Sequence, residues 1–67
     1  MIEFQMTVPN SGARYIDKFR VLANQTSRLT DFIETKDGFI FMFEFISFAE
    51  QEYFKRKTDQ LFPNLFK

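Results

Sequence analysis

The chain has 67 residues, with nine basic and nine acidic side chains, eleven phenylalanines, no cysteine and no histidine. The missing residue types exclude disulfides and thiolate zinc sites, and they remove the side chain most often used as a metal ligand or as an acid–base catalyst near neutral pH. A formal net charge of zero argues against long-range attraction to nucleic acid or to an anionic membrane.

The length predicts one small domain over residues 1–67. Such a domain buries only about 60% of its unfolded surface, so its stability depends on a dense core or on a partner. Each phenylalanine buries on the order of 150–250 Å². A core with few layers does not easily hide all of them, and we expect some of this surface to face another chain.

The first half of the chain predicts a strand and then a helix. Residues 2–8 alternate apolar and polar side chains, which is typical of a strand with one buried face. Residues 9–12, Pro-Asn-Ser-Gly, predict a turn. From Ala13 the apolar spacing becomes helical, so we expect an amphipathic helix capped by Asn10 or Ser11 and ended by residues 24–27.

The second half begins with two strands. Residues 28–34 predict a strand, and the turn segment Thr35-Lys36-Asp37-Gly38 follows it. Its Asp-Gly pair predicts a hairpin, because glycine accepts the positive φ of tight turns. In residues 39–46 every odd position is phenylalanine, and the even positions are Ile40, Met42, Glu44 and Ile46. With both faces apolar, this third strand is expected to be buried on both sides.

A second helix follows the third strand. Ser47-Phe48-Ala49-Glu50 has the pattern of a capping box, which satisfies backbone donors at the start of a helix. We expect the helix to run to about Leu61, with Phe54, Thr58 and Leu61 on one stripe, because Pro63 prevents its continuation.

The order β-α-β-β-α predicts an α+β fold with a three-stranded mixed or antiparallel sheet and two helices on one face. The first helix supplies the right-handed crossover between the first two strands, and the hairpin places the third strand between them. The uncovered face would carry Ile40, Met42 and Ile46, or the four phenylalanines of strand three if the register is reversed. We interpret such a face as a protein interface, with the candidate residues Phe39, Ile40, Phe41, Met42, Phe43, Phe45 and Ile46.

No pattern predicts a catalytic, metal or cofactor site, and we expect no cofactor and no enzymatic activity. Glu44 is the one carboxylate inside an apolar run. It would be the catalytic carboxylate if an oligomer formed a pocket between sheet and helices. It also fits the solvated face or end of a strand, or a pair with a lysine or arginine. Residues 10–12 could hold an anion on backbone N–H groups, or serve simply as cap and turn.

The one basic cluster is Lys55-Arg56-Lys57. Together with Phe39 and Phe41 it predicts the alternative function, a single-stranded nucleic-acid-binding protein in which bases stack on rings and phosphates meet cations. Nearby carboxylates at helical spacing would neutralise much of this charge, which favours a solvated helix face instead.

A strand, a turn with Gly12-Ala13-Arg14 opening a helix, and a hairpin followed by Ser47 resemble the family of the phosphocarrier protein HPr over roughly the first fifty residues. The family's phosphorylated histidine, expected between Gly12 and Ala13, is absent, as are its last strand and helix. The resemblance therefore implies a relative that has lost phosphotransfer.

The leading hypothesis is a non-enzymatic protein-interaction module, a small regulator or inhibitor of the phage or mobile-element type. It would form a homodimer, and this homodimer would bind an unidentified protein partner stoichiometrically. No run approaches the ~20 apolar residues of a membrane span, and the sequence has no signal-peptide pattern. A cytoplasmic location and no membrane partner are therefore expected.

Overall fold

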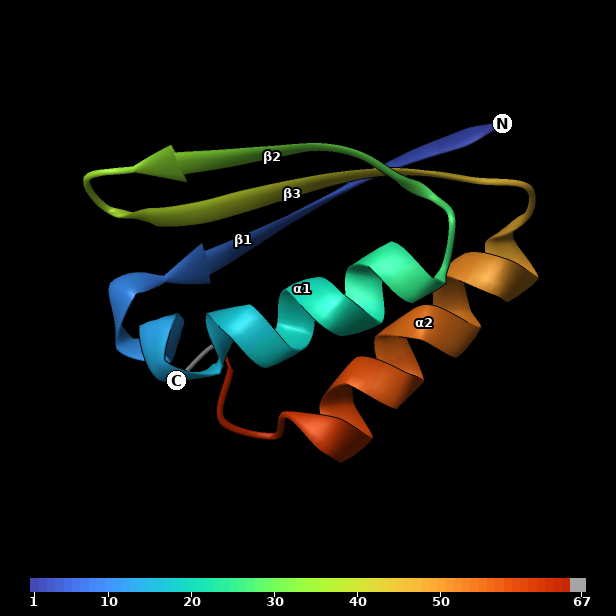
Figure 1. Cartoon of the computed structure of the whole chain (residues 1–67). Coiled ribbons are helices and arrows are strands. Elements are labelled where there is room, and N and C mark those ends of the chain that lie inside the picture. The colour runs from blue at the N-terminus through green and yellow to red at the C-terminus, as the bar shows by residue number, and fades with distance from the viewer. Residues whose placement is uncertain (66–67) are drawn as a thin grey trace.

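The computed structural model describes residues 1–65. Its elements are, in chain order, β1 (Ile2–Pro9), a 3₁₀ helix η1 (Asn10–Tyr15), α1 (Ile16–Gln25), β2 (Leu29–Thr35), β3 (Gly38–Phe45) and α2 (Phe48–Leu61). The strands form one sheet in the order β1-β3-β2, with β3 antiparallel to both neighbours. Both helices lie on one face of this sheet (Figure 1). The predicted α+β class, the order of elements and the central place of the third strand are confirmed.

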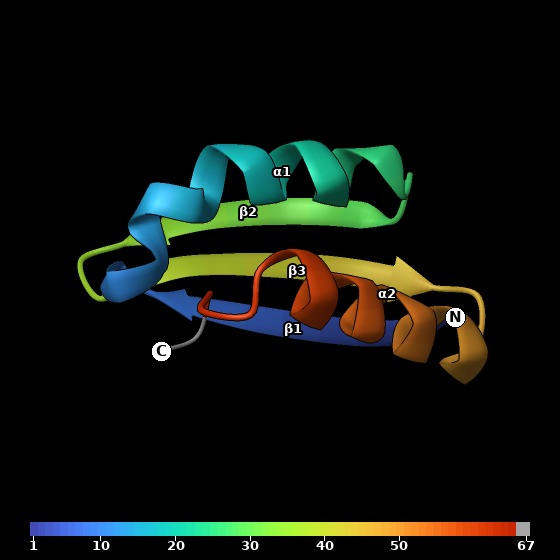
Figure 2. The ribbon, with the colours of Figure 1, turned by 90° about the horizontal axis from the view of Figure 1, so that it is seen from below.

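The two helices are not stacked over the middle of the sheet. Seen from the helix side, α1 follows the β2 side and α2 follows the β1 side, with β3 between them (Figure 2). Each helix therefore packs on the same face above one edge strand, α1 over β2 and α2 over β1.

Strand β3 buries one face only. Phe41, Phe43 and Phe45 are 0%, 1% and 0% exposed, whereas Met42 is 36% exposed. Ile40 is half-buried and Glu44 is exposed. The expectation that this strand is buried on both sides is wrong, because both helices pack against its phenylalanine side and no element among residues 1–65 covers the other.

Contacts between aromatic rings join the helices to the sheet. The Phe19 ring of α1 meets the Phe41 ring edge-on, with centroids 4.7 Å apart. The Phe54 ring of α2 lies 4.9 Å from that of Phe43 and 5.6 Å from that of Phe45. Such tilted and edge-on pairs add about 0.5–1.5 kcal/mol beyond the burial of their area.

The first helix begins later than predicted and ends where it was predicted to end. The expected cap at Asn10 or Ser11 is wrong: residues 10–15 form η1, and α1 follows Tyr15 without a side-chain cap. The Asn10 amide instead donates to the Lys36 carbonyl oxygen at 2.9 Å, which ties η1 to the β2–β3 hairpin. The predicted end is confirmed, since α1 stops at Gln25 and Ser27 takes a left-handed φ of 59°.

The hairpin between β2 and β3 has a two-residue loop, Lys36-Asp37, because Thr35 pairs with Gly38. This loop is the centre of the predicted turn Thr35-Lys36-Asp37-Gly38, so the predicted hairpin is confirmed. Gly38 is the first residue of β3, with a φ of 155°, and its lack of a side chain lets it pass close to β1. A Cβ there would collide with the Val8 carbonyl oxygen.

Helix α2 has the predicted bounds and cap. The Ser47 hydroxyl accepts a hydrogen bond from the Glu50 N–H at 3.3 Å. Phe54 and Thr58 are buried as expected, but Leu61 is exposed, so the predicted inward stripe ends one turn early. After the helix, Leu65 returns to the core beside Gly12, where a Cβ would strike the Leu65 carbonyl oxygen.

Truncating one core ring should test this packing. Phe41→Ala should lower the free energy of unfolding by about 3–5 kcal/mol, because it removes a fully buried ring and leaves a cavity. Phe48→Ala is the matched control: the Phe48 side chain is 69% exposed, so its loss should change stability by less than about 0.5 kcal/mol. Urea unfolding followed by circular dichroism would measure both. Equal losses in the two variants would contradict the assignment of the core.

Candidate functional site: the open sheet face and the interhelical groove

The side of the sheet that faces away from the helices is one candidate site, here called the open face. The register places Gln5 and Asp31 opposite Met42, and Ile33 opposite Ile40. The open face therefore consists of alternate residues from all three strands: Glu3, Gln5, Thr7, Asp31, Ile33, Thr35, Ile40, Met42 and Glu44.

An apolar strip crosses the middle of this face. Ile33 and Met42 are 40% and 36% exposed, and Ile40 between them is half-buried. Isolated apolar residues on a surface need no explanation, but these three side chains are neighbours on adjacent strands. They form a continuous apolar contact area.

Carboxylates lie around the strip. Glu3 faces Glu44 directly across the β1–β3 pair, and Asp31 faces Met42 from β2. A depression of about 410 Å³ at this end is lined by Glu3, Phe4, Gln5, Thr30, Met42, Phe43 and Glu44. Like charges directly opposite one another destabilise a sheet. The open face thus has three acidic groups and, among its strand residues, no basic one.

The residues predicted as a protein interface are divided between two sides of the sheet. Phe41, Phe43 and Phe45 are inside the core. Phe39 is half-buried on the same side, stacked on Phe32 with centroids 6.1 Å apart. Only Ile40 and Met42 are on the open face, and Ile46 is exposed just beyond the end of β3.

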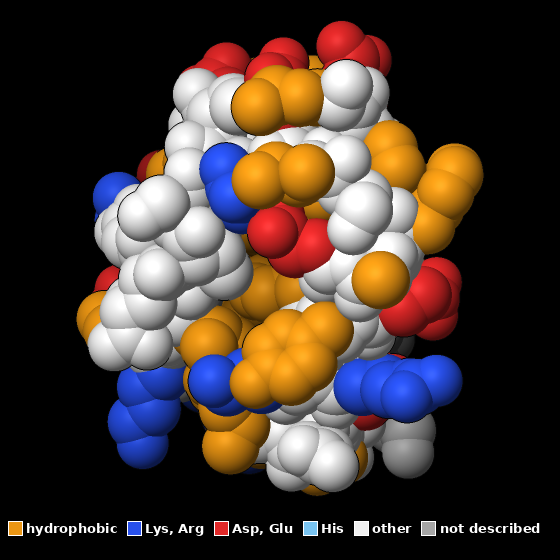
Figure 3. Space-filling model, turned by 90° about the vertical axis from the view of Figure 1, so that its right-hand side faces the viewer, with side chains coloured by type: hydrophobic (Ala, Val, Ile, Leu, Met, Phe, Trp, Pro, Cys, Tyr) orange, Lys and Arg blue, Asp and Glu red, His pale blue; other side chains and the backbone are white. Residues whose placement is uncertain are grey.

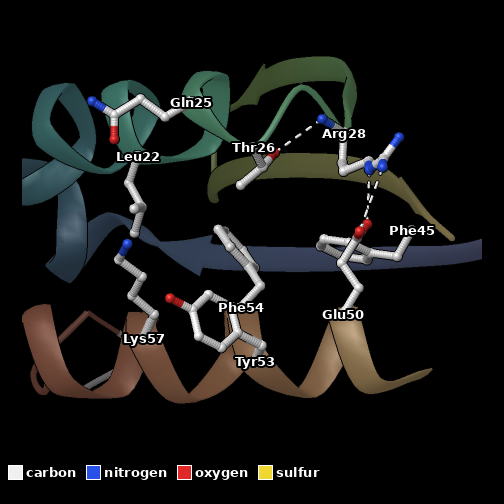
Figure 4. A pocket seen from close by; sticks show the side chains of 9 residues that line it. All are labelled: Leu22, Gln25, Thr26, Arg28, Phe45, Glu50, Tyr53, Phe54 and Lys57. Atoms are coloured by element: carbon white, nitrogen blue, oxygen red, sulfur yellow. Dashed lines mark hydrogen bonds and ion pairs between the residues drawn. The ribbon is translucent and has the colours of Figure 1, made fainter. Parts of the chain in front are cut away.

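A second candidate site is the interhelical groove, a hollow of about 300 Å³ between the end of α1 and the start of α2. Leu22, Phe45 and Phe54 form its apolar floor, and its rim consists of polar residues and one aromatic ring: Gln25, Thr26, Arg28, Glu50, Tyr53 and Lys57. Figure 3 shows this side of the molecule, with hydrophobic side chains in the hollow and basic and acidic ones around it. Figure 4 shows the Tyr53 ring in front of Phe54, with Lys57 reaching toward Leu22.

An ion pair closes one end of the groove (Figure 4). The Arg28 guanidinium donates from Nε to Glu50 Oε1 at 2.7 Å and from Nη2 to Glu50 Oε2 at 3.4 Å. Glu50 Oε1 also accepts the Ile46 N–H at 3.3 Å. The same carboxylate therefore joins the residue before the N-cap of α2 to the segment between α1 and β2.

The groove does not contain Glu44, the carboxylate that the enzymatic alternative names. Its one carboxylate, Glu50, is occupied by Arg28, and Glu44, the carboxylate considered from the sequence, points to the opposite side of the sheet. Among residues 1–65 no group of three or more carboxylates is placed to hold a metal ion. The volume of the groove is about 300 Å³, which is at the lower limit for ligand-binding sites. It would fit one large apolar side chain or a small molecule.

The residues that would bind nucleic acid do not lie together on one surface. Lys55, Arg56 and Lys57 are exposed on α2, on the helix side of the sheet, and Lys55 pairs with Glu52 at 3.6 Å. Phe41 is fully buried and cannot stack on a base. The sheet face that is accessible carries carboxylates, which repel phosphates.

Residues 10–12 are not arranged as an anion site. They belong to the six-residue η1, and Gly12 is buried beside Leu65. The Asn10 amide is directed to the Lys36 carbonyl oxygen. This segment connects the hairpin, η1 and the core.

Several site residues were not identified from the sequence. Glu3, Asp31 and Ile33 belong to the open face, and Arg28 belongs to the groove. The alternation of residues 2–8 places Glu3 outside the core, but its position opposite Glu44 follows only from the strand register. For Arg28, the partner is 22 positions away, so no local pattern reveals it.

Comparison of the chain with protein-family models, with curated proteins and with solved structures found no match. The resemblance to the phosphocarrier family is therefore without support from relatives. No helix among residues 1–65 has both the length and the apolar character that crossing a membrane requires.

The ion pair at the groove can be tested with a double-mutant cycle. Removing Arg28 and Glu50 singly and together should give a coupling energy of about 1 kcal/mol, because the pair is nearly bidentate and its side chains are only 26% and 34% exposed. The matched control is Glu52 with Lys55, whose side chains are 53% and 46% exposed. Its coupling should be below about 0.5 kcal/mol. Urea unfolding of the alanine variants measures both energies, and equal couplings would contradict the structural role given to Arg28.

Proposed function

We propose that this protein is a non-enzymatic interaction module that binds a basic protein partner on its open face. The observation that carries the proposal is one surface that combines an uncovered apolar strip with three carboxylates and no cation among its strand residues. The strip, Ile33, Ile40 and Met42, supplies area that is favourable to remove from water. The carboxylates determine which partner can approach.

Charge complementarity selects the chemistry of the partner. Acidic groups around an apolar centre attract lysine and arginine side chains, whose aliphatic stems also cover apolar surface. Two open faces packed against each other would bring six carboxylates into one interface. Like-charge contacts of this kind cost several kcal/mol, so the partner on this face is a different protein rather than a second copy.

The interhelical groove is a less suitable binding site for a protein partner than the open face. Its floor is already covered by close packing of Leu22, Phe45 and Phe54 against the core, and its rim charges include an internal ion pair. A docking partner there would have to compete with Arg28 for Glu50. The open face has no such internal competitor for Glu3 and Glu44.

A small binding module of this kind acts by stoichiometry, so a regulator or an inhibitor of the phage or mobile-element type is the biological class that we propose, together with a cytoplasmic location. This part rests on the small size of the chain and on analogy with a class.

The proposal predicts what an unbiased selection will return. The immobilised protein should select, from a random displayed peptide library, sequences that combine lysine or arginine with leucine, isoleucine or aromatic residues. Their binding should weaken as salt is added, since charge attraction is screened. Selection of acidic or uncharged peptides would contradict the proposal, as would tight binding of an oligothymidine probe in place of peptides.

Variants then locate the site. Glu44→Lys should weaken a selected peptide by about tenfold, or about 1.4 kcal/mol, by reversing one charge on the open face. Glu34→Lys is the matched control, because Glu34 is equally acidic and exposed in the same sheet but lies opposite Phe39, on the helix side. Met42→Asp should also weaken binding although it adds an acid, since it removes the centre of the apolar strip. Fluorescence anisotropy measures all three, and an equal effect of Glu34→Lys would place the site elsewhere.

A further inference from the structure

The outer edge of β1 is an unprotected sheet edge. Its pairing with β3 is unbroken from Ile2 to Pro9, its only charged residue is Glu3, and its only proline is the last residue. Within residues 1–65 no strand lies on its other side (Figure 2). Backbone N–H and C=O groups on such an edge are a template for another strand.

The other edge of the sheet is blunted in the ways that natural proteins use. The register of β2 shifts between Leu29 and Asp31, which marks a bulge at Thr30. The Thr30 hydroxyl donates inward to the Met42 carbonyl oxygen at 3.0 Å, and the Arg20 guanidinium lies 4.4 Å above the Phe32 ring. Of the two edges, β1 is the one open to regular pairing.

There is room beside β1 for an added strand. A groove of about 250 Å³ follows four consecutive residues of β1, from Phe4 to Thr7, and α2 contributes Lys55 and Asp59 to its lining. These two α2 side chains are exposed and polar, so they do not close the edge with apolar packing.

The sequence of β1 is complementary to itself when read in opposite directions about Gln5. In antiparallel pairing centred there, Phe4 lies opposite Met6 and Ile2 opposite Val8, on the helix side. On the open side, Glu3 lies opposite Thr7 and Gln5 opposite Gln5 of the other copy. Apolar residues meet apolar residues and no like charges meet. A centre at Glu3 would instead oppose two glutamates.

We propose that β1 pairs with β1 of a second copy of this chain about a two-fold axis at Gln5, forming a continuous six-stranded sheet. This isologous contact satisfies both edges at once and leaves β2 at each outer margin. It is independent of what the open face binds.

Exposed apolar side chains at one end of β1 support this arrangement. Met1 and Ile46 are 81% and 59% exposed, and they adjoin because Ile2 pairs with Phe45. Phe48, at the start of α2 and two residues after Ile46 in the sequence, is also exposed. In the proposed register the Val8–Pro9 end of the second copy lies beside Ile2, where it would cover part of this surface.

The pairing has a consequence for the open face. Because the two sheets share one plane, their open faces lie on the same side, and Gln5 of each copy links the two apolar strips. A partner that is itself dimeric would then meet two acidic surfaces, which raises its avidity through effective concentration.

The absence of cysteine from the chain allows a direct test by cross-linking. Gln5→Cys should form a disulfide-linked dimer under mild oxidation, because directly opposed residues of antiparallel strands have Cα atoms about 4.5–5.5 Å apart, within disulfide range. Glu3→Cys is the matched control: in this register the two copies of residue 3 are four positions apart along the strands, about 13 Å. It should stay uncrosslinked under the same conditions.

Charge variants provide a test without a covalent bond. Gln5→Lys and Gln5→Glu should each raise the dissociation constant of the dimer at least about tenfold, because they place like charges opposite each other. An equimolar mixture of the two should recover the dimer as a heterodimer. Asn24→Lys, an exposed position on α1, should leave the dissociation constant within about twofold. Sedimentation over a hundredfold concentration range measures the association, and circular dichroism verifies that each variant is folded.

The outcomes are decisive in both directions. A self-cross-link at residue 5 but not at residue 3, with recovery in the mixture, supports the β1 pairing. A monomer at all concentrations, a dimer insensitive to the residue 5 charges, or cross-linking at residue 3 in place of residue 5 overturns it. None of these measurements uses a basic peptide, so failure here is separate from failure of the open-face proposal.

Discussion

The contact of three phenylalanines of β3 with one phenylalanine from each α-helix organises this molecule. Phe41 meets Phe19 of α1, and Phe43 and Phe45 meet Phe54 of α2. Because these rings are bulky and belong to one face of the central strand, both helices are held on that face. The opposite face of the sheet is left uncovered as a direct result. The outer edge of β1 has no neighbouring strand among residues 1–65. The candidate surfaces for binding follow from this one packing choice.

The sequence allows much of this fold to be predicted, because its strongest signals are local. The alternation of residues 2–8, the helical spacing after Ala13 and the capping box at Ser47 each depend on neighbours within a few positions, and each marks a real element. The face of β3 that the helices cover could not be decided, since both sides of this strand are apolar in sequence. The choice is made by the fit of Phe19 and Phe54 to the phenylalanine side, which is a tertiary property.

The candidate sites were harder to predict than the fold for the same reason. Glu3 and Glu44 are 41 positions apart in the numbering and opposed in the sheet, and only the register brings them together. Asn10 looks like a helix cap, yet its amide donates to Lys36 on the hairpin. In both cases a polar side chain has a partner from a distant part of the chain. Local patterns assign such residues to the wrong neighbour or to none.

The net charge of the chain does not show how its charges are distributed over the two sides of the sheet. Zero net charge suggests a surface without a preference for charged partners. The three α- and 3₁₀-helical segments carry six cations and four carboxylates, whereas the open face carries three carboxylates and no cation among its strand residues. The two sides of the sheet therefore differ in sign. A partner close to one side of the sheet interacts with the charges on that side rather than with the net charge of the chain. The reason is that salt screens charges more distant than about 8–10 Å. A neutral chain can in this way present an acidic binding face.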